Sequence, residues 1–338
     1  MKKLEKEIWI VAAKRTPFGA MGGAFKALSA TDLGVHAAKA ALAQSGLEPT
    51  EIDHVVFGNV QQTSPDAIYC ARHVGLKAGL PIEVPAITVN RLCGSGFQAV
   101  VTAAQDILVG DSKAVLCGGT ENMSQAPHSV WGMREGARFG QPPAMVDTLW
   151  ASLTDSYCKT AMAVTAENLA EKYGITREDC DTFALKSQQR WAAANESGGF
   201  ADELPRSRKG RKGPVTVAVD EHPGRRPRCR GNASGICDGA VALVVCDEEW
   251  AKERSEAARE ASCERRCRAV AHGHRPAPAI RSAPFTGRAR DGQIDWFDVN
   301  EVSAQRLAVQ REPGAGLRRR ATRTARSPSV TRSAPRGP

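Results

Sequence analysis

Residues 89–108, V-N-R-L-C-G-S-G-F-Q-A-V-V-T-A-A-Q-D-I-L, connect an expected strand to an expected helix. The apolar run 84–89 is typical of a buried strand, and no helix breaker occurs from residue 97 to residue 108. Cys93 therefore lies on a tight strand-to-helix turn. We expect Gly94 and Gly96 to allow the sharp bend and to leave room for a ligand.

The position of Cys93 is typical of an activated nucleophile. The first amides of a helix present free N–H groups and partial positive charge, so a thiol placed there ionises more readily than a free thiol. The alternative is that Cys93 is a small buried residue between glycines, and for an isolated cysteine that alternative is the better one. The residues around Cys93 have to separate the two interpretations.

These residues closely resemble the nucleophile segment of the thiolase family, whose members make or cleave 3-ketoacyl-CoA thioesters. R15-T-P-F-G19 and C117-G-G-T-E-N-M-S124 match the thiolase pattern in order and spacing. The resemblance implies an α/β fold with a layered αβαβα architecture, in which two related halves stack and a loop domain is inserted in the first. Ketoacyl synthases share the nucleophile turn, but the first motif and G231-N-A-S-G235 favour thiolases.

Strand and helix patterns alternate along the first part of the chain, which predicts an α/β layer with a mostly parallel sheet. Ser29 is an expected N-cap of a helix that closes at Gly46, and Gly174 is an expected helix end followed by the N-cap Thr176. Expected strands start near residues 9, 53, 84, 114 and 240, and expected helices cover 67–76, 97–108 and 165–173.

The expected division of the chain has four parts. Residues 1–124, completed by about 231–250, form the first thiolase-like half, and 125–230 form the inserted loop domain. Residues 251–312 form a second half that is incomplete or partly disordered. Residues 313–338 hold seven arginines and no acid, so we expect a disordered basic tail.

The net charge of +9 is unevenly distributed. Residues 1–204 carry 18 Lys and Arg against 22 Asp and Glu, a net of −4, whereas residues 205–338 carry 28 against 15, a net of +13. Arginine also replaces lysine as the usual basic residue after position 204. This abrupt change favours the hypothesis that stretches after residue 204 are out of register with an ancestral reading frame.

The resemblance to thiolases also assigns substrate-binding residues. Leu153 and Met162 would line the tunnel for the acyl and pantetheine groups, although ordinary helix packing explains both residues equally well. Ala233 and Ser234 would lie beside the coenzyme. Asn300 would hold a water that hydrogen-bonds the thioester oxygen, where negative charge develops in the reaction.

Two further catalytic groups of the family have no counterpart in the sequence. Thiolases use a histidine in a Gly-His-Pro motif to activate the nucleophile and a second cysteine in a Cys-x-Gly motif as acid and base. Here no Gly-His-Pro occurs and no cysteine follows Cys267. We therefore expect slow acylation of Cys93 by acyl-CoA without condensation.

The remaining expectations concern ligands and surroundings. The substrates would be acyl-CoA and coenzyme A, with no further cofactor, and family members form homodimers or homotetramers. The short apolar run 8–13 does not suit a signal peptide, so we expect a cytoplasmic protein that does not enter a membrane. Neither the basic tail nor Cys263, Cys267, His272 and His274 have the pattern of a specific nucleic-acid or structural zinc site.

Two functions from different classes follow. The first is an acyl-CoA acyltransferase of the thiolase type that acts through an acyl-cysteine intermediate. The second is a non-catalytic protein that binds CoA esters or assists assembly and retains the fold and the pocket. Binding of acyl-CoA without turnover would favour the second.

Overall fold

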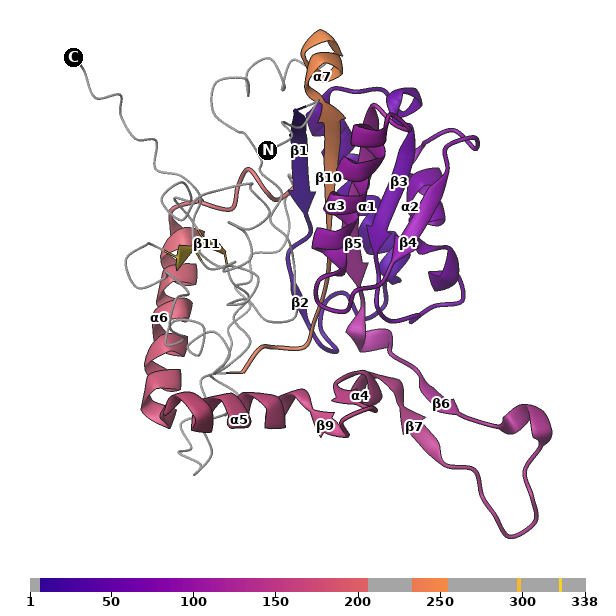
Figure 1. Ribbon diagram of the computed structural model, residues 1–338, viewed down its shortest axis with the longest axis vertical. Helices are drawn as coiled ribbons and strands as arrows, with labels where there is room; N and C mark the ends of the chain where they lie inside the picture. The colour runs from indigo at the N-terminus through magenta and orange to yellow at the C-terminus, as the bar shows by residue number, and fades with distance from the viewer. Residues whose placement is uncertain (1–6, 206–232, 255–296, 299–321, 324–338) are drawn as a thin grey trace. The chain divides into compact units, whose positions relative to one another are not determined.

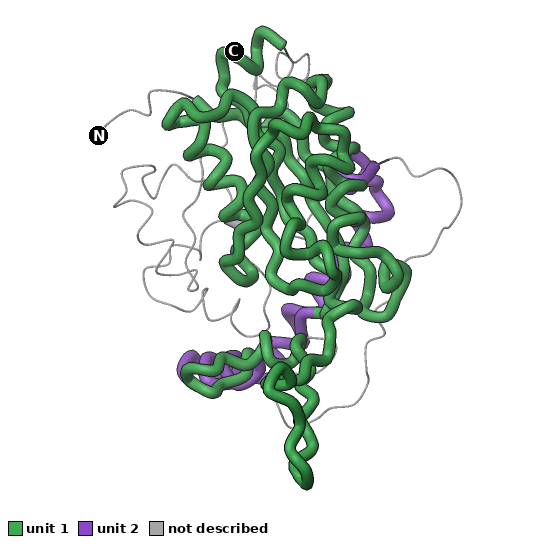
Figure 2. Tube along the Cα trace, turned by 90° about the vertical axis from the view of Figure 1, so that its right-hand side faces the viewer, with its two compact units in different colours: residues 1–162, 235–274 green, residues 163–234, 275–338 purple. Residues whose placement is uncertain are grey.

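The computed structural model describes residues 7–205, 233–254, 297–298 and 322–323. The chain separates into two compact units, one of residues 1–162 and 235–274 and the other of residues 163–234 and 275–338 (Figure 2). The basic tail lies almost entirely outside the described residues, and the four-part division expected from the sequence stays a prediction.

The first unit is built on a mixed sheet with the strand order β1-β10-β5-β3-β4 (Figure 1). β5, β3 and β4 pair in parallel, but β10 is antiparallel to both of its neighbours, so the sheet is less parallel than expected. The first residues of β10 also pair with β2, the short strand that follows β1 in the chain. This pairing is antiparallel too, so β10 runs opposite to β1 and β2. The strands are β1 (Ile8–Arg15), β2 (Gly19–Ala20), β3 (His54–Gly58), β4 (Ala86–Val89), β5 (Ala114–Glu121) and β10 (Cys237–Asp247).

Helices cover both faces of this sheet. Because side chains alternate along a strand, Val55 and Phe57 of β3 face α1 (Ala30–Ser45) and α2 (Cys70–Ala78), whereas Val56 faces α3 (Ser95–Val109). β4 is shorter than the expected strand 84–89 and is only partly buried, because it lies at the edge of the sheet. α7 (Glu248–Arg254) follows β10 and packs beside β1.

α3 is unusually apolar. Within the described residues, Leu92–Val109 is the one segment long and apolar enough to cross a membrane by length and composition. Its buried residues Ala99, Ala103 and Ile107 pack on the sheet against Val56 and Val115, however. A core helix of an α/β layer meets the same criterion, so length and composition alone are weak evidence for a membrane span.

The region after Asn122 holds short hairpins, one short helix and then two longer helices. The helices are α4 (Thr148–Ser152), α5 (Met162–Tyr173) and α6 (Arg177–Glu196). The hairpins are β6 (His128–Val130) with β7 (Met145–Asp147) and β8 (Thr154–Asp155) with β9 (Thr160–Ala161), and β11 (Phe297–Asp298) pairs in parallel with β12 (Thr322–Arg323). Short 3-10 turns lie at Pro49–Glu51, Ala67–Tyr69, Met123–Gln125 and Met133–Glu135.

The expected helix caps are confirmed. The Ser29 hydroxyl accepts a hydrogen bond from the Asp32 amide at the start of α1, and Gly46 ends this helix with φ 70°. Thr176 forms a capping box with Asp179 at the start of α6, and Gly174 follows α5 with φ 60°. These caps depend only on neighbouring residues, which is why the sequence predicts them.

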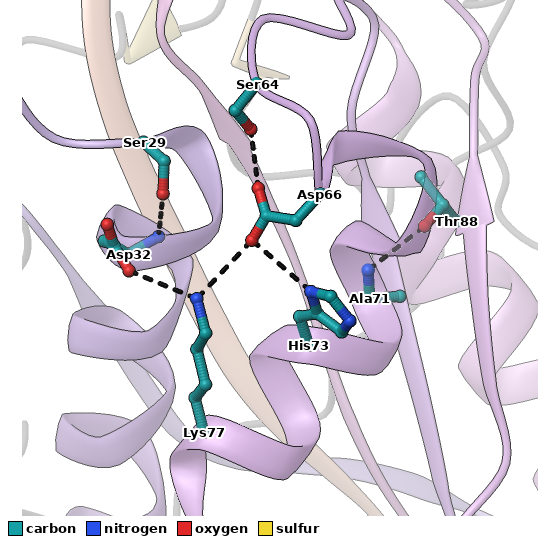
Figure 3. A network of polar contacts seen from close by, with 8 residues as sticks. All are labelled: Ser29, Asp32, Ser64, Asp66, Ala71, His73, Lys77 and Thr88. Carbon is teal, nitrogen blue, oxygen red and sulfur yellow. Dashed lines mark hydrogen bonds and ion pairs between the residues drawn. The ribbon is translucent and has the colours of Figure 1, made fainter.

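A polar network fixes the connection between β3 and α2 (Figure 3). Asp66 accepts a hydrogen bond from the Ser64 hydroxyl at 2.7 Å and lies 3.3 Å from His73 Nδ1 and 3.4 Å from Lys77 Nζ. Lys77 also reaches Asp32 at the start of α1, at 3.5 Å. Burial raises the pKa of Asp66, but the hydrogen bonds from Ser64 and His73 and the charge of Lys77 outweigh burial and lower this pKa to about 2.

The Asp66→Asn substitution is expected to lower the free energy of unfolding at neutral pH by about 1 kcal/mol, since solvent screens this partly exposed network. A carboxyl whose pKa falls on folding stabilises the fold above its unfolded pKa, and this contribution is lost as the pH falls from about 4 towards 2. Urea unfolding should therefore separate wild type from variant at neutral pH, by about half as much near pH 3, and by little near pH 2. The exposed Glu83 provides the control Glu83→Gln. A difference that is equal at all pH values would contradict the prediction.

Candidate active site

Cys93 lies on the turn between β4 and α3, as expected, and its side chain is exposed. The turn is fixed by its own side chains: the Asn90 carbonyl oxygen Oδ1 accepts from the Leu92 amide at 3.0 Å, and the Ser95 hydroxyl donates to the Leu92 carbonyl at 2.6 Å. The Ser95 hydroxyl also accepts from the Arg91 amide at 2.9 Å. The turn therefore presents Cys93 directly before the first residues of a helix.

The expected role of the glycines in this turn is wrong in one respect. The left-handed residue is Leu92, with φ 49°, whereas Gly94 has φ −87° and serves as the N-cap of α3. The hydrogen bonds of Asn90 and Ser95 hold Leu92 in this uncommon conformation. Gly96 has open space where a side chain would begin, in agreement with room for a ligand.

Close packing of α3 on the sheet depends instead on glycines in the strands. A Cβ atom on Gly58, the last residue of β3, would lie 2.6 Å from the backbone carbon of Ser95. A Cβ atom on Gly119 of β5 would lie 3.4 Å from the Cα atom of Gly96. The start of α3 can therefore lie directly on β3 and β5. This close contact sets the position of Cys93 relative to the carboxyl ends of these strands.

The buried thiols of the first unit are poor competitors for Cys93. Cys70 and Cys117 are buried, and burial raises the pKa of each to about 12. Burial also raises the pKa of Cys246. Among the described cysteines, the exposed thiols are Cys93 and Cys158, and Cys158 lies between the short strands β8 and β9.

The two sequence motifs that flank the nucleophile segment join distant parts of the sheet. Thr16 exchanges two hydrogen bonds with Ala240 across 224 residues of sequence, and the ring of Phe18 fills the space beside Gly239. Asp238 accepts from both the amide and the hydroxyl of Ser124, at 3.0 and 2.5 Å. The motifs therefore assemble the edge where β5 ends and β10 begins.

Glu121 is a residue at this edge that the sequence analysis did not identify. It ends β5, and its carboxylate accepts from the amides of Val60 and Gln61 at 2.9 and 3.1 Å and from Asn59 Nδ2 at 3.2 Å. Burial raises the pKa of Glu121 to about 7, against the opposite effect of these hydrogen bonds. The available signal was an acid at the end of a strand whose other residues are apolar, glycine or threonine.

The structure brings Leu153 and Met162 together. They flank the β8–β9 hairpin, and the Met162 amide donates to the Leu153 carbonyl at 2.9 Å. Met162 is 41% exposed and Leu153 is partly buried, so both side chains are accessible for contact with a ligand. Their role in lining an acyl tunnel stays a prediction.

The other expected site residues cannot be placed beside Cys93. Ala233 and Ser234 belong to the second unit, directly before the segment that enters β10. Asn300 lies outside the described residues, as do Cys263, Cys267, His272 and His274. Among the residues that the structure describes, no group of three or more His, Cys, Asp or Glu side chains is arranged to hold a metal ion.

This chain is similar in sequence and in structure to several known proteins. Residues 8–249 match the family model described as "Thiolase, N-terminal domain". The mitochondrial 3-ketoacyl-CoA thiolase of Mus musculus is 47% identical over 91% of this chain and 83% of its own length, and a probable acetyl-CoA acyltransferase of Staphylococcus aureus is 40% identical over 90% and 83%. The crystal structure of human mitochondrial 3-ketoacyl-CoA thiolase in complex with CoA has a TM-score of 0.80 and 42% identity, over 91% of this chain and 82% of that one.

Proposed function

The chain belongs to the thiolase family, and on this basis we propose that it is an acyl-CoA acyltransferase that forms or cleaves 3-ketoacyl-CoA through an acyl thioester on Cys93. One observation carries the proposal: an exposed cysteine stands on a fixed turn directly before the N-terminus of α3, at the carboxyl ends of parallel strands. Ligands of α/β sheets bind at this end of the strands. The relative solved with CoA supports CoA thioesters as substrates.

The chemistry of the first step follows from this geometry. Cys93 attacks the carbonyl carbon of the thioester as a thiolate, after its proton has passed to solvent; a new carbon–sulfur bond forms, and the bond to the CoA sulfur breaks. CoA leaves as a thiolate and takes up a proton. The N-terminus of α3 supplies amide N–H groups and partial positive charge where negative charge develops on the carbonyl oxygen.

Completion of the reaction needs a base and an acid for the second substrate. The printed sequence has no Gly-His-Pro motif and no cysteine after Cys267, so the resemblance to thiolases assigns no residue of this sequence to these two roles. We expect the acyl-enzyme to accumulate because its transfer is slow. The same absence favours the second candidate function, a protein that binds CoA esters without turnover.

The proposal extends to assembly by family likeness, which favours a homodimer or homotetramer. The expected cytoplasmic location receives no support from the relatives, because the mouse relative is mitochondrial by name.

Incubation of the full chain with acetyl-CoA, followed by intact-mass measurement and peptide mapping, tests the proposal. We expect an acetyl group on Cys93, a thermal shift with CoA, and thiolysis of a 3-ketoacyl-CoA that is far slower than acylation. A thermal shift without an adduct would favour the non-catalytic binder. Rapid thiolysis would show that other residues replace the missing motifs.

A further inference from the structure

The loop 59–61 after β3 contacts three parts of the first unit at once. Glu121 binds the loop from β5, and two other contacts leave it, one towards the Cys93 turn and one towards Ser152. Because residues 59–61 hold all these hydrogen bonds, a shift of the loop at Glu121 also shifts its contacts with the Cys93 turn and with Ser152. Glu121 therefore differs from a partly buried acid that contacts only its own surroundings, because its partners lead to two other segments.

The first contact leads to the nucleophile. Asn90 Nδ2 donates to the Val60 carbonyl at 3.3 Å, while the Oδ1 atom of the same side chain accepts from the Leu92 amide at 3.0 Å. The backbone of Val60 therefore donates through its N–H group to Glu121 and accepts through its carbonyl oxygen from Asn90. Leu92, whose φ of 49° sets the bend of the turn, directly precedes Cys93.

The second contact leads to the residues expected to hold the acyl group. Gln61 Nε2 donates to the Ser152 hydroxyl at 2.5 Å, and this hydroxyl donates in turn to the Leu149 carbonyl at 2.8 Å. Leu153 follows Ser152 directly and is bonded to Met162 across the β8–β9 hairpin. One loop thus connects the nucleophile turn and the expected acyl-binding segment.

We propose that Glu121 is a positioning residue that, through the loop 59–61, sets the place of Cys93 relative to the Leu153–Met162 segment. Its three donors all point at carboxylate oxygens, so an uncharged amide in the same place meets at least one N–H group with another N–H group. The loop must then move. This inference rests on the proposed acyl transfer at Cys93.

The test uses the Glu121→Gln variant of the full chain and a matched control at the other end of β5. There Asp53 accepts from the amides of Lys113 and Ala114 at 2.7 and 3.0 Å, roughly 23 Å along the strand from Glu121. Both Glu121→Gln and Asp53→Asn are expected to lower the midpoint of urea unfolding. Only Glu121→Gln is expected to slow acetylation of Cys93 by acetyl-CoA, about tenfold or more.

Two milder variants test the contact with the Cys93 turn and the contact with Ser152 separately. They also keep the proposal testable if the Glu121 variant does not fold. The exposed Asn90 allows Asn90→Ala, which should lower the maximal acetylation rate at least fivefold. Ser152→Ala should raise the half-saturating acetyl-CoA concentration more than it lowers that rate. Equal effects of Glu121→Gln and Asp53→Asn on acetylation, or no effect of Asn90→Ala, would overturn the proposal.

A second readout keeps this inference separate from the proposed function. Iodoacetamide labels exposed thiols without any need for CoA, and free glutathione in the same reaction serves as the reference, because the exposed Cys158 lies inside the Leu153–Met162 segment. We expect Glu121→Gln to change the ratio of Cys93 to glutathione labelling rates at least threefold and Asp53→Asn to leave it unchanged. If acetyl-CoA does not acylate the wild type, the proposed function fails, and this ratio alone decides the role of Glu121.

Discussion

Replacement of Cys93 by alanine is expected to abolish the acyl adduct and to lower any thiolysis by more than roughly 10³-fold. The described thiols other than Cys93 do not offer a substitute at this place. Cys117 packs in the core with Ala99 of α3, but it is buried and its pKa is raised to about 12 by burial. The effect should fall on chemistry alone, because the exposed side chain of Cys93 contributes little to packing.

The matched control is Cys158→Ala. Cys158 is also exposed and free, but it lies between the short strands β8 and β9 and not before a long helix. It should therefore keep the adduct, the CoA-induced thermal shift and the unfolding midpoint of the wild type. A Cys93→Ala protein that still gains one acetyl group at another cysteine would contradict the assignment of the nucleophile.

Local features of the fold could be predicted because their causes are local. The caps at Ser29, Gly46 and Thr176 depend on residues within one turn, and the place of Cys93 depends on the patterns directly before and after it. The sequence pattern also predicted the strand 240–245 within β10. These features needed no knowledge of distant contacts.

Long-range features escaped prediction for the corresponding reason. The direction of β10 follows from its pairing with β1 and β2 more than 200 residues earlier, which no periodicity records. The role of Glu121 arises from donors about 60 residues away. Leu92 was also missed, because its left-handed conformation is imposed by Asn90 and Ser95 and glycine is the residue that normally indicates it.

The Gly58→Ala variant is expected to cause the largest loss of stability near the site, about 3 kcal/mol in the free energy of unfolding. The added methyl group would lie 2.6 Å from the backbone carbon and 2.8 Å from the carbonyl oxygen of Ser95. A flexible side chain could turn away from such a contact, but backbone atoms at the start of a helix cannot. The start of α3 must therefore lift from the sheet.

Gly96→Ala is the matched variant, because it adds the same methyl group one residue after Ser95 with nothing within 4 Å. Alanine also favours a helix over glycine, so the free energy of unfolding should rise by about 0.5 kcal/mol. Urea unfolding of both variants, beside acetylation of Cys93 at several acetyl-CoA concentrations, makes the comparison.

The two variants should distinguish a change in the position of Cys93 from a change in the access of substrate to Cys93. In Gly58→Ala the turn moves with α3, so the maximal acetylation rate of Cys93 should fall at least tenfold. In Gly96→Ala the turn keeps its place, and only a substrate that passes over Gly96 would meet the new methyl group, which would raise the half-saturating concentration. If Gly58→Ala unfolds like the wild type, α3 does not rest closely on β3, and the sheet glycines do not fix the position of Cys93.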